Sequence, residues 1–246
     1  MDVNLYDYYY KSVSLIICDI CGSIFLRLMK ADDLFKKGLN ELNIPCYPEQ
    51  IRAFMTFLSE LKKWNGAYNL TALKTDEDIV IKHFLDSLLY LRTLPAGTLK
   101  LVDAGTGAGF PGIPIKIIMP GIDLTLIESS KKKAAFLRHI IRSLKLSSVT
   151  VLEQRLESLG KEYESTFDVI VSRATFSIKE FLKLAGPYIK EGGILVLNKG
   201  PKAAKEIRDS GAENAVRDIL HVRLPFTHAE RQLLVLECKN RPYGKM

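Results

Sequence analysis

From residue 96 onward, short apolar segments alternate with longer segments whose apolar residues have helical spacing. The clearest of the longer segments is 130–145, where Leu137, Ile140, Ile141 and Leu144 form one apolar stripe. Alternation of strands and helices produces parallel sheets covered by helices. The sequence therefore predicts an α/β fold with a doubly wound parallel sheet, whose strands we place at 99–104, 122–127, 148–153, 167–172, 193–198 and 231–237.

The region before this alternation has the pattern of helices alone. Pro48 is a favourable first residue for a helix, and apolar residues on one helical face follow it. Thr75, with Asp78 three residues later, resembles a helix-capping pair. We expect a helical cap over residues 29–95, packed on the α/β domain over residues 96–246.

Residues 1–28 differ from the rest of the chain. Their apolar segment, 12–26, is short and interrupted by Asp19, and the residues before it are acidic and aromatic where an export signal is basic. We therefore expect neither a signal peptide nor a membrane span here. Met29 precedes the first helical pattern, and we expect translation to begin there, with residues 1–28 as an atypical extension.

The cysteines do not have the pattern of a disulfide-bonded or metal-binding protein. Four cysteines in 246 residues are unevenly spread and have no histidines at metal-ligand spacing: Cys18, Cys21, Cys46 and Cys238. The sequence predicts no disulfide scaffold and no metal site. A reducing cytoplasm is the simplest location for such a chain, and we expect a monomer.

The segment VDAGTGAGFPGIP, residues 102–114, follows the first predicted strand and opens the next helix. At such a turn a ligand meets strand ends and the positive end of a helix, and glycine lets it approach the backbone. Two motifs fit the same letters. Gly105, Gly107 and Gly109 form G-x-G-x-G, which favours S-adenosylmethionine, whereas Gly107, Gly109 and Gly112 form G-x-G-x-x-G, which favours a dinucleotide.

Three neighbouring features bear on this choice. Glu128 follows the second predicted strand, where either cofactor needs a carboxylate for its ribose hydroxyls. Asp103 lies two residues before Gly105, where it orients the turn or meets a cationic ligand. Phe110 and Pro111 occupy the place where a pyrophosphate needs open backbone amides. These features favour S-adenosylmethionine and leave the dinucleotide as the alternative.

Positive charge is concentrated in the second part of the chain. The whole chain has a net charge of +7, and residues 96–246 carry 24 Lys and Arg against 16 Asp and Glu. Lys131, Lys132 and Lys133 lie in the first turn of the predicted helix 130–145, where the helix dipole disfavours cations. Lys199 follows the fifth predicted strand. We expect these lysines to contact RNA phosphates, although a solvated basic surface gives the same pattern.

Five segments, in order and spacing, resemble the ribosomal RNA small-subunit methyltransferase G family, also called glucose-inhibited division protein B. They are NLTA (69–72), KHFLDS (82–87), DAGTGAGFPGIP (103–114), VSRA (171–174) and LNKG (197–200). The resemblance covers roughly residues 30–240. It implies a class I S-adenosylmethionine-dependent methyltransferase with a Rossmann-like sheet and an N-terminal helical cap. It also implies methyl transfer to N7 of a guanosine in small-subunit ribosomal RNA.

The residues agree with this chemistry. Enzymes that methylate exocyclic amines place an N/D-P-P-Y/F motif after the fourth strand, where this chain has VSRA. Guanine N7 carries a free lone pair, so no general acid or base is expected. We expect Arg173 to face the cofactor or the target nucleotide, with an internal ion pair as the alternative, and His83 either to contact RNA or to serve as a structural residue. Leu156 and Glu157 follow the third strand, where this fold holds adenine.

Two other functions stay open from the sequence. The chain is either an RNA-binding module that retains the fold without turnover, or a methyltransferase for a protein or a small molecule. Tight S-adenosylmethionine binding without methyl transfer to ribosomal RNA would indicate the first, and activity on free nucleosides would favour the second.

Overall fold

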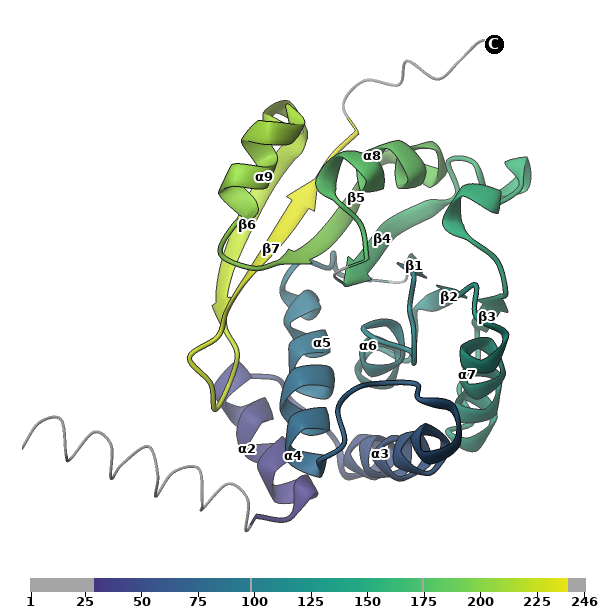
Figure 1. The fold of residues 1–246 in the computed structure, drawn as a ribbon, viewed down its shortest axis with the longest axis vertical. Helices are drawn as coiled ribbons and strands as arrows, with labels where there is room; N and C mark the ends of the chain where they lie inside the picture. Colours follow the sequence, from purple (N-terminus) through teal and green to yellow (C-terminus); the bar gives the residue numbers. More distant parts are fainter. Residues whose placement is uncertain (1–28, 98, 174, 239–246) are drawn as a thin grey trace, which may run out of the picture.

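The fold is known from a computed structural model, which describes residues 29–97, 99–173 and 175–238. Our expectations about residues 1–28, including the start at Met29, lie outside this part of the chain. A seven-stranded sheet forms the centre of the molecule, and helices cover both of its faces (Figure 1). No helix in the described part is long and apolar enough to cross a membrane.

The strand order is β3-β2-β1-β4-β5-β7-β6. The first five strands in this order are parallel, and β7 is antiparallel to both of its neighbours. Their bounds are β1 Lys100–Ala104, β2 Asp123–Ile127, β3 Val149–Leu152, β4 Phe167–Arg173, β5 Ile189–Lys199, β6 Val216–Arg223 and β7 Glu230–Leu236. The six predicted strands are all present.

The prediction was wrong on two points at one edge of the sheet. The sheet is mixed, not wholly parallel, and β6 was missed. Only residues 224–229 join β6 to β7, a connection too short for the crossover that parallel strands need. β6 also mixes charged and apolar residues, because it lies at the edge and is mostly exposed or half-buried.

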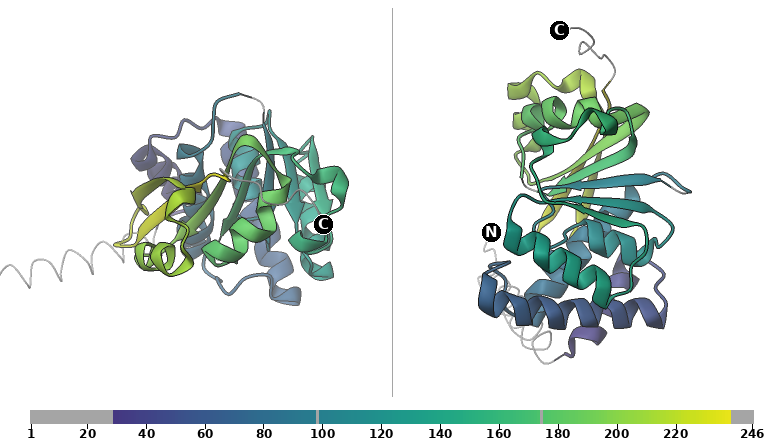
Figure 2. Two further views of the ribbon diagram at one scale, coloured as in Figure 1. Left: turned by 90° about the horizontal axis from the view of Figure 1, so that it is seen from above. Right: turned by 90° about the vertical axis from the view of Figure 1, so that its right-hand side faces the viewer.

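Alternate residues of the strands build two cores. Leu101, Leu124 and Val169 face one core, which also contains the cap helices, α6 (Gly112–Ile118) and α7 (Lys131–Ser143). Val102 and Ile170 face the other core, under α8 (Ile178–Ala185) and α9 (Ala203–Ser210). Figure 2 shows the sheet between these two helical layers, as the two-residue period of strands requires.

The helical cap is present as expected. It consists of α2 (Ala31–Leu42), α3 (Pro48–Tyr68), α4 (Asp76–Ile79), the π-helical turn η1 (Val80–Leu85), α5 (Asp86–Leu88) and the 3₁₀ turn η2 (Leu89–Arg92). Pro48 begins α3, and the Thr75 hydroxyl accepts a hydrogen bond from the backbone N–H of Asp78. Both predicted helix starts are therefore confirmed.

Aromatic rings join the cap to the α/β domain. Phe57 of α3 stacks on Phe110 of the glycine turn, with ring centroids 5.1 Å apart. Phe84 of η1 lies 5.4 Å from Phe57 and 6.1 Å from Phe110, and Phe136 of α7 lies 6.2 Å from Phe57. All four side chains are buried. The cap and the sheet thus share one hydrophobic core, so we expect them to unfold together.

Replacement of Phe57 tests this shared core. Phe57→Ala removes a buried ring that touches both parts and should lower the free energy of unfolding by about 3–5 kcal/mol. Chemical denaturation followed separately by cap and sheet probes should give coincident transitions. Tyr47→Ala is the control, because Tyr47 is 68% exposed and its removal should change stability by less than about 0.5 kcal/mol. A cap transition that precedes the sheet transition would contradict a shared core.

Candidate active site at the carboxyl end of the sheet

The glycine turn connects the end of β1 to α6. Gly105, Gly107 and Gly109 have φ values of +70°, +62° and +98°, a region that other residues rarely adopt. A Cβ atom added at Gly105 would approach the Thr175 side chain to 2.9 Å. A Cβ added at Gly107 would meet no described atom within 4 Å. The turn therefore presents bare backbone to open space at Gly107.

The Asp103 carboxylate holds the turn from beneath. Its Oδ2 accepts hydrogen bonds from Thr106 Oγ1 at 2.5 Å and from the backbone N–H of Gly112 at 2.7 Å. Asp103 is completely buried, and no described residue bonds its Oδ1. Burial raises the pKa of Asp103 to about 6, against the opposing effect of its two hydrogen bonds. A second, unused acceptor atom is thus held beside the turn.

Glu128 joins the turn from the end of β2. Its Oε2 accepts a hydrogen bond from the Gly107 backbone N–H at 2.9 Å, and its Oε1 accepts one from the Ser130 N–H at 2.8 Å. Each carboxylate oxygen keeps a further lone pair. The structure therefore brings together three predicted site residues, Asp103, Gly107 and Glu128, at adjacent parallel strand ends.

Leu156 and Glu157 follow β3 in a short 3₁₀ turn. Leu156 is buried in the core under α8. Glu157 is on the surface, with its Oε1 3.6 Å from Arg155 Nη1. Neither residue contacts the glycine turn through a hydrogen bond, so their predicted contact with adenine remains a prediction.

A second cluster lies where β4 ends against the cap. Arg173 Nη2 donates a hydrogen bond to His83 Nδ1 at 3.0 Å, and its guanidinium lies 5.2 Å from the centre of the Phe110 ring. His83 also stacks on Phe110, since the two ring centroids lie 4.3 Å apart at an angle of 17°. The side chain of Phe110 is buried in the core, and its predicted contact with the cofactor remains a prediction.

Two residues that we did not predict complete this cluster. The Asp86 carboxylate, almost fully buried, accepts a hydrogen bond from Arg231 Nε at 2.7 Å and lies 3.6 Å from Arg173 Nη1. Asp86 belongs to KHFLDS and Arg231 begins the last predicted strand, so both lay in segments already singled out. Their pairing spans 145 residues and needed the fold to reveal it.

His83 is neutral in this cluster. Burial and the adjacent Arg173 charge lower the pKa of His83 to about 3. Because a guanidinium can only donate, His83 Nδ1 is an acceptor and its proton is on Nε2. Nε2 lies 2.8 Å from the Thr71 hydroxyl. His83 therefore has no lone pair left to accept a proton from a substrate.

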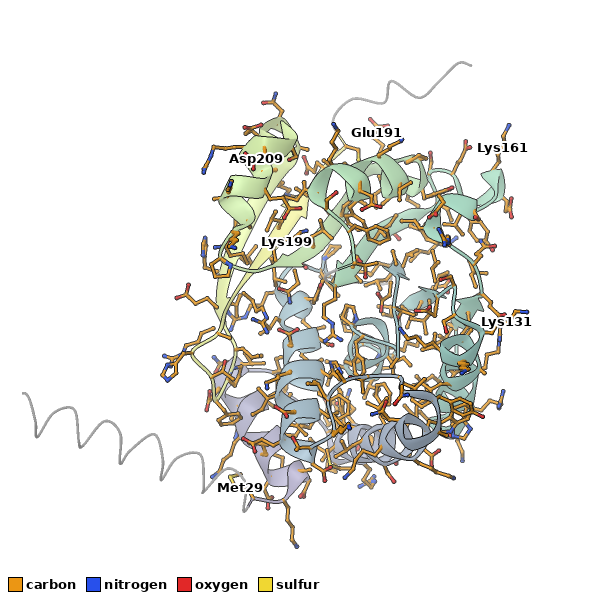
Figure 3. All side chains as sticks on the ribbon, viewed as in Figure 1. Met29, Lys131, Lys161, Glu191, Lys199 and Asp209 are labelled. Carbon is orange, nitrogen blue, oxygen red and sulfur yellow. The ribbon has the colours of Figure 1, made fainter. Side chains whose placement is uncertain are left out.

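The predicted RNA-binding lysines differ in their surroundings. Lys131 and Lys132 are exposed and Lys133 is half-buried in the first turn of α7, and Lys132 Nζ lies 6.0 Å from the centre of the Tyr68 ring. Lys199 instead donates to the Phe176 carbonyl and to Glu206. Figure 3 shows Lys131 at the rim of the molecule and Lys199 between α9 and the sheet. Internal partners thus occupy Lys199.

These residues fit S-adenosylmethionine. The open backbone at Gly107 admits a ligand, Glu128 can accept hydrogen bonds from ribose hydroxyls, and the ionised form of Asp103 suits a cationic group. The sheet, the turn after its first strand and the carboxylate after its second define a class I S-adenosylmethionine-dependent methyltransferase.

The comparisons name the family. A model of rRNA small subunit methyltransferase G matches residues 50–235. The chain is 36% identical over 219 residues to the ribosomal RNA small subunit methyltransferase G of Alkaliphilus oremlandii, covering 85% of this chain and 91% of that one. The protein of that name from Geobacter sp. strain M21 is 38% identical over 216 residues, covering 85% and 98%. The chain belongs to the rRNA small subunit methyltransferase G family.

A solved structure supports the fold alone. The crystal structure of TrmN from Thermus thermophilus is 18% identical, with a TM-score of 0.51, and the match covers 62% of this chain and 48% of that one. The expectation of a methyltransferase fold with S-adenosylmethionine as its methyl donor is confirmed, and the dinucleotide alternative is not supported.

Two glycines with the same backbone conformation test the turn. Gly107→Ala places a methyl group in the open space beside Glu128 and should weaken S-adenosylmethionine binding more than tenfold in calorimetric titrations. Gly211→Ala is the matched control, because Gly211 has a φ of +64° and open space around it but ends α9. Both changes should cost about 1–2 kcal/mol of stability. Equal cofactor affinity in the two variants would remove Gly107 from the site.

Asp103 should make both stability and cofactor binding depend on pH. Its pKa is raised from 3.8 to about 6 on folding, so the folded chain holds a proton there that the unfolded chain has released. The contribution of Asp103 to the free energy of unfolding therefore falls as the pH rises from 3.8 to about 6, and it is constant above that pH. A cationic cofactor favours the ionised carboxylate, so affinity for S-adenosylmethionine should rise from pH 5 to pH 7. Asp103→Asn should flatten this rise of affinity with pH in calorimetric titrations. If the affinity of the variant rises with pH as in the wild type, another group is responsible.

Proposed function

We propose that the protein transfers the methyl group of S-adenosylmethionine to N7 of a guanosine in small-subunit ribosomal RNA. The engagement of both ring nitrogens of His83, one by Arg173 and one by Thr71, is the observation that carries this choice, because it leaves His83 no free nitrogen to act as a base beside the glycine turn. An exocyclic amine or a hydroxyl must lose a proton when it is methylated, whereas N7 attacks with a free lone pair. The names of the relatives, which are ribosomal RNA methyltransferases, support the substrate class.

The residues of the chain position the reactants. When bound, S-adenosylmethionine supplies an electrophilic methyl group on a sulfonium. Gly107 and Glu128 hold the nucleoside part of the cofactor, and Asp103 provides negative charge beneath the turn. Arg173 is fixed by stacking on Phe110 and by its bond to His83, so a cation of fixed orientation faces the side where the RNA enters. Rate enhancement then comes from in-line approach in a preorganised site.

The RNA strand meets the molecule at the first turn of α7. Lys131 and Lys132 are exposed there and form no ion pair with any described residue, and the half-exposed ring of Tyr68 lies beside Lys132. Exposed cations next to an aromatic ring suit a phosphate backbone with an accessible base. Lys133 is the third member of this basic face. The proposal includes a cytoplasmic location and action as a monomer.

Chemical mapping tests the reaction. Ribosomal RNA from cells with and without the protein is reduced and treated with aniline, which cleaves the chain at N7-methylguanosine. A cleavage in the small-subunit RNA that disappears with the protein supports the proposal. A methylated exocyclic amine, or methyl transfer only to free nucleosides or protein, would overturn it. Tight cofactor binding without any transfer would indicate an RNA-binding module.

Charge neutralisation tests the basic face. The double variant Lys131→Gln with Lys132→Gln should weaken RNA binding, and its salt dependence should become shallower by roughly 0.7–0.9 in log–log slope for each phosphate that is no longer neutralised. The control is Lys202→Gln with Lys205→Gln, which removes the same charge from exposed positions at α9. Fluorescence anisotropy with labelled small-subunit RNA measures both. Equal weakening in the two double variants would show that net charge alone binds the RNA.

A further inference from the structure

Thr71 lies in the connection from α3 to α4, which passes in front of α6 in the view of Figure 1. Its side-chain oxygen takes part in two hydrogen bonds. It accepts one from the backbone N–H of Leu73 at 3.2 Å. The other joins it to His83 Nε2 at 2.8 Å.

The direction of the second bond follows from Arg173. The guanidinium donates to His83 Nδ1 at 3.0 Å and cannot accept. A proton on Nδ1 would face this donor, so the imidazole carries its single proton on Nε2. Nε2 therefore donates to Thr71, in agreement with the low pKa of His83. The three side chains form one directed chain of hydrogen bonds, from Arg173 through His83 to Thr71.

This direction leaves the Thr71 hydroxyl with one role. A hydroxyl oxygen has two lone pairs, and the Leu73 N–H and His83 Nε2–H occupy both. The hydroxyl proton remains, and the described residues offer it no acceptor. Thr71 is half-buried, so part of this residue is open to solvent. The surroundings have thus made Thr71 a donor that cannot act as an acceptor.

The chain of hydrogen bonds ends beside the reaction site. It starts at Arg173, the last residue of β4, at the edge of the sheet that carries the glycine turn. Its middle member, His83, stacks on Phe110, which directly follows Gly109 of that turn. Thr71 therefore lies on the cap side of the place where the cofactor and the substrate base meet.

We propose that the Thr71 hydroxyl donates a hydrogen bond to O6 of the target base and thereby selects guanine over adenine. This inference rests on the proposed function, in which N7 is the methyl acceptor. Beside N7, guanine presents the O6 acceptor, whereas adenine presents the N6 amino donor. A hydroxyl that can only donate forms a hydrogen bond with guanine O6. In adenine the same hydroxyl faces a second donor, the N6 amino group, and no hydrogen bond forms. The bond also fixes the base in its plane, so that the N7 lone pair points at the methyl group.

The test combines a change in the enzyme with a change in the base. Thr71→Val keeps the shape of the side chain and removes the hydroxyl, and Thr71→Ser restores it. The RNA carries either guanosine or 2-aminopurine at the mapped position; 2-aminopurine keeps N7 and lacks O6. Single-turnover rates at subsaturating enzyme give the guanine-to-2-aminopurine preference of each protein. Calorimetry gives the affinity for S-adenosylhomocysteine.

The wild-type protein and Thr71→Ser should prefer guanine by about tenfold or more, in line with the value of a specific base contact. Thr71→Val should lose most of its rate on guanine and most of this preference, with cofactor affinity unchanged. Any penalty from the altered N1 of 2-aminopurine is common to all proteins and cancels. If Thr71→Val does not fold, Thr71→Cys replaces it. A thiol is a poor hydrogen-bond donor, but its sulfur can still accept the hydrogen bond from His83 Nε2–H.

Other outcomes separate the possible errors. A Thr71→Val protein that keeps the full preference for guanine overturns the inference, although the proposed function stands. A loss of S-adenosylhomocysteine affinity in Thr71→Val would assign the hydroxyl to the cofactor and also overturn it. If the wild-type protein forms no N7-methylguanosine, the proposed function itself is wrong, whatever the variants show.

Discussion

Two hydrogen bonds to one oxygen of Asp103 hold the glycine turn in the form that the site needs. The Thr106 hydroxyl and the Gly112 backbone N–H come from the two ends of the turn, and the shared acceptor brings them together. The carboxylate is fully buried, so its ionisation is unfavourable and its pKa is high. The chain thus keeps a buried carboxylate with one oxygen that no described residue bonds at the candidate site, and broken local rules of this kind commonly mark functional sites.

The shape of the turn has effects on both of its sides. On one side the Gly107 N–H donates a hydrogen bond to Glu128, the carboxylate that we propose for the cofactor. On the other side the buried Phe110 ring lies in the aromatic core beside Phe57, with His83 stacked on it and the Arg173 guanidinium over it. The turn therefore connects the proposed cofactor site to the cluster formed by Arg173 and His83. The helical cap supplies His83 and Phe57 to this arrangement, so the cap and the turn depend on each other for their structure.

The sequence predicted the features that depend on local pattern. The six strands, the starts of α3 and of the helix at Thr75, and the meeting of the glycine turn with Glu128 all follow from periodicity and from the order of parallel strands. Features that depend on long-range pairing were missed. The partners of Arg173, which are Asp86 and His83, lie far from it in the sequence, and only the fold shows that they set its orientation. Lys199 was predicted to contact RNA phosphates, and its hydrogen bonds to Glu206 and to the Phe176 carbonyl were not foreseen. β6 was missed because an edge strand has a weak apolar pattern.

The bond between Arg231 and Asp86 links the last strand of the chain to the cap across 145 residues. During synthesis, α3, the glycine turn and the first four parallel strands leave the ribosome before β7 exists. A nascent chain therefore has the glycine turn and Glu128 well before it has the Arg231 contact that fixes Asp86 and, through it, Arg173. The order of synthesis thus makes the cluster around Arg173 form later than the glycine turn.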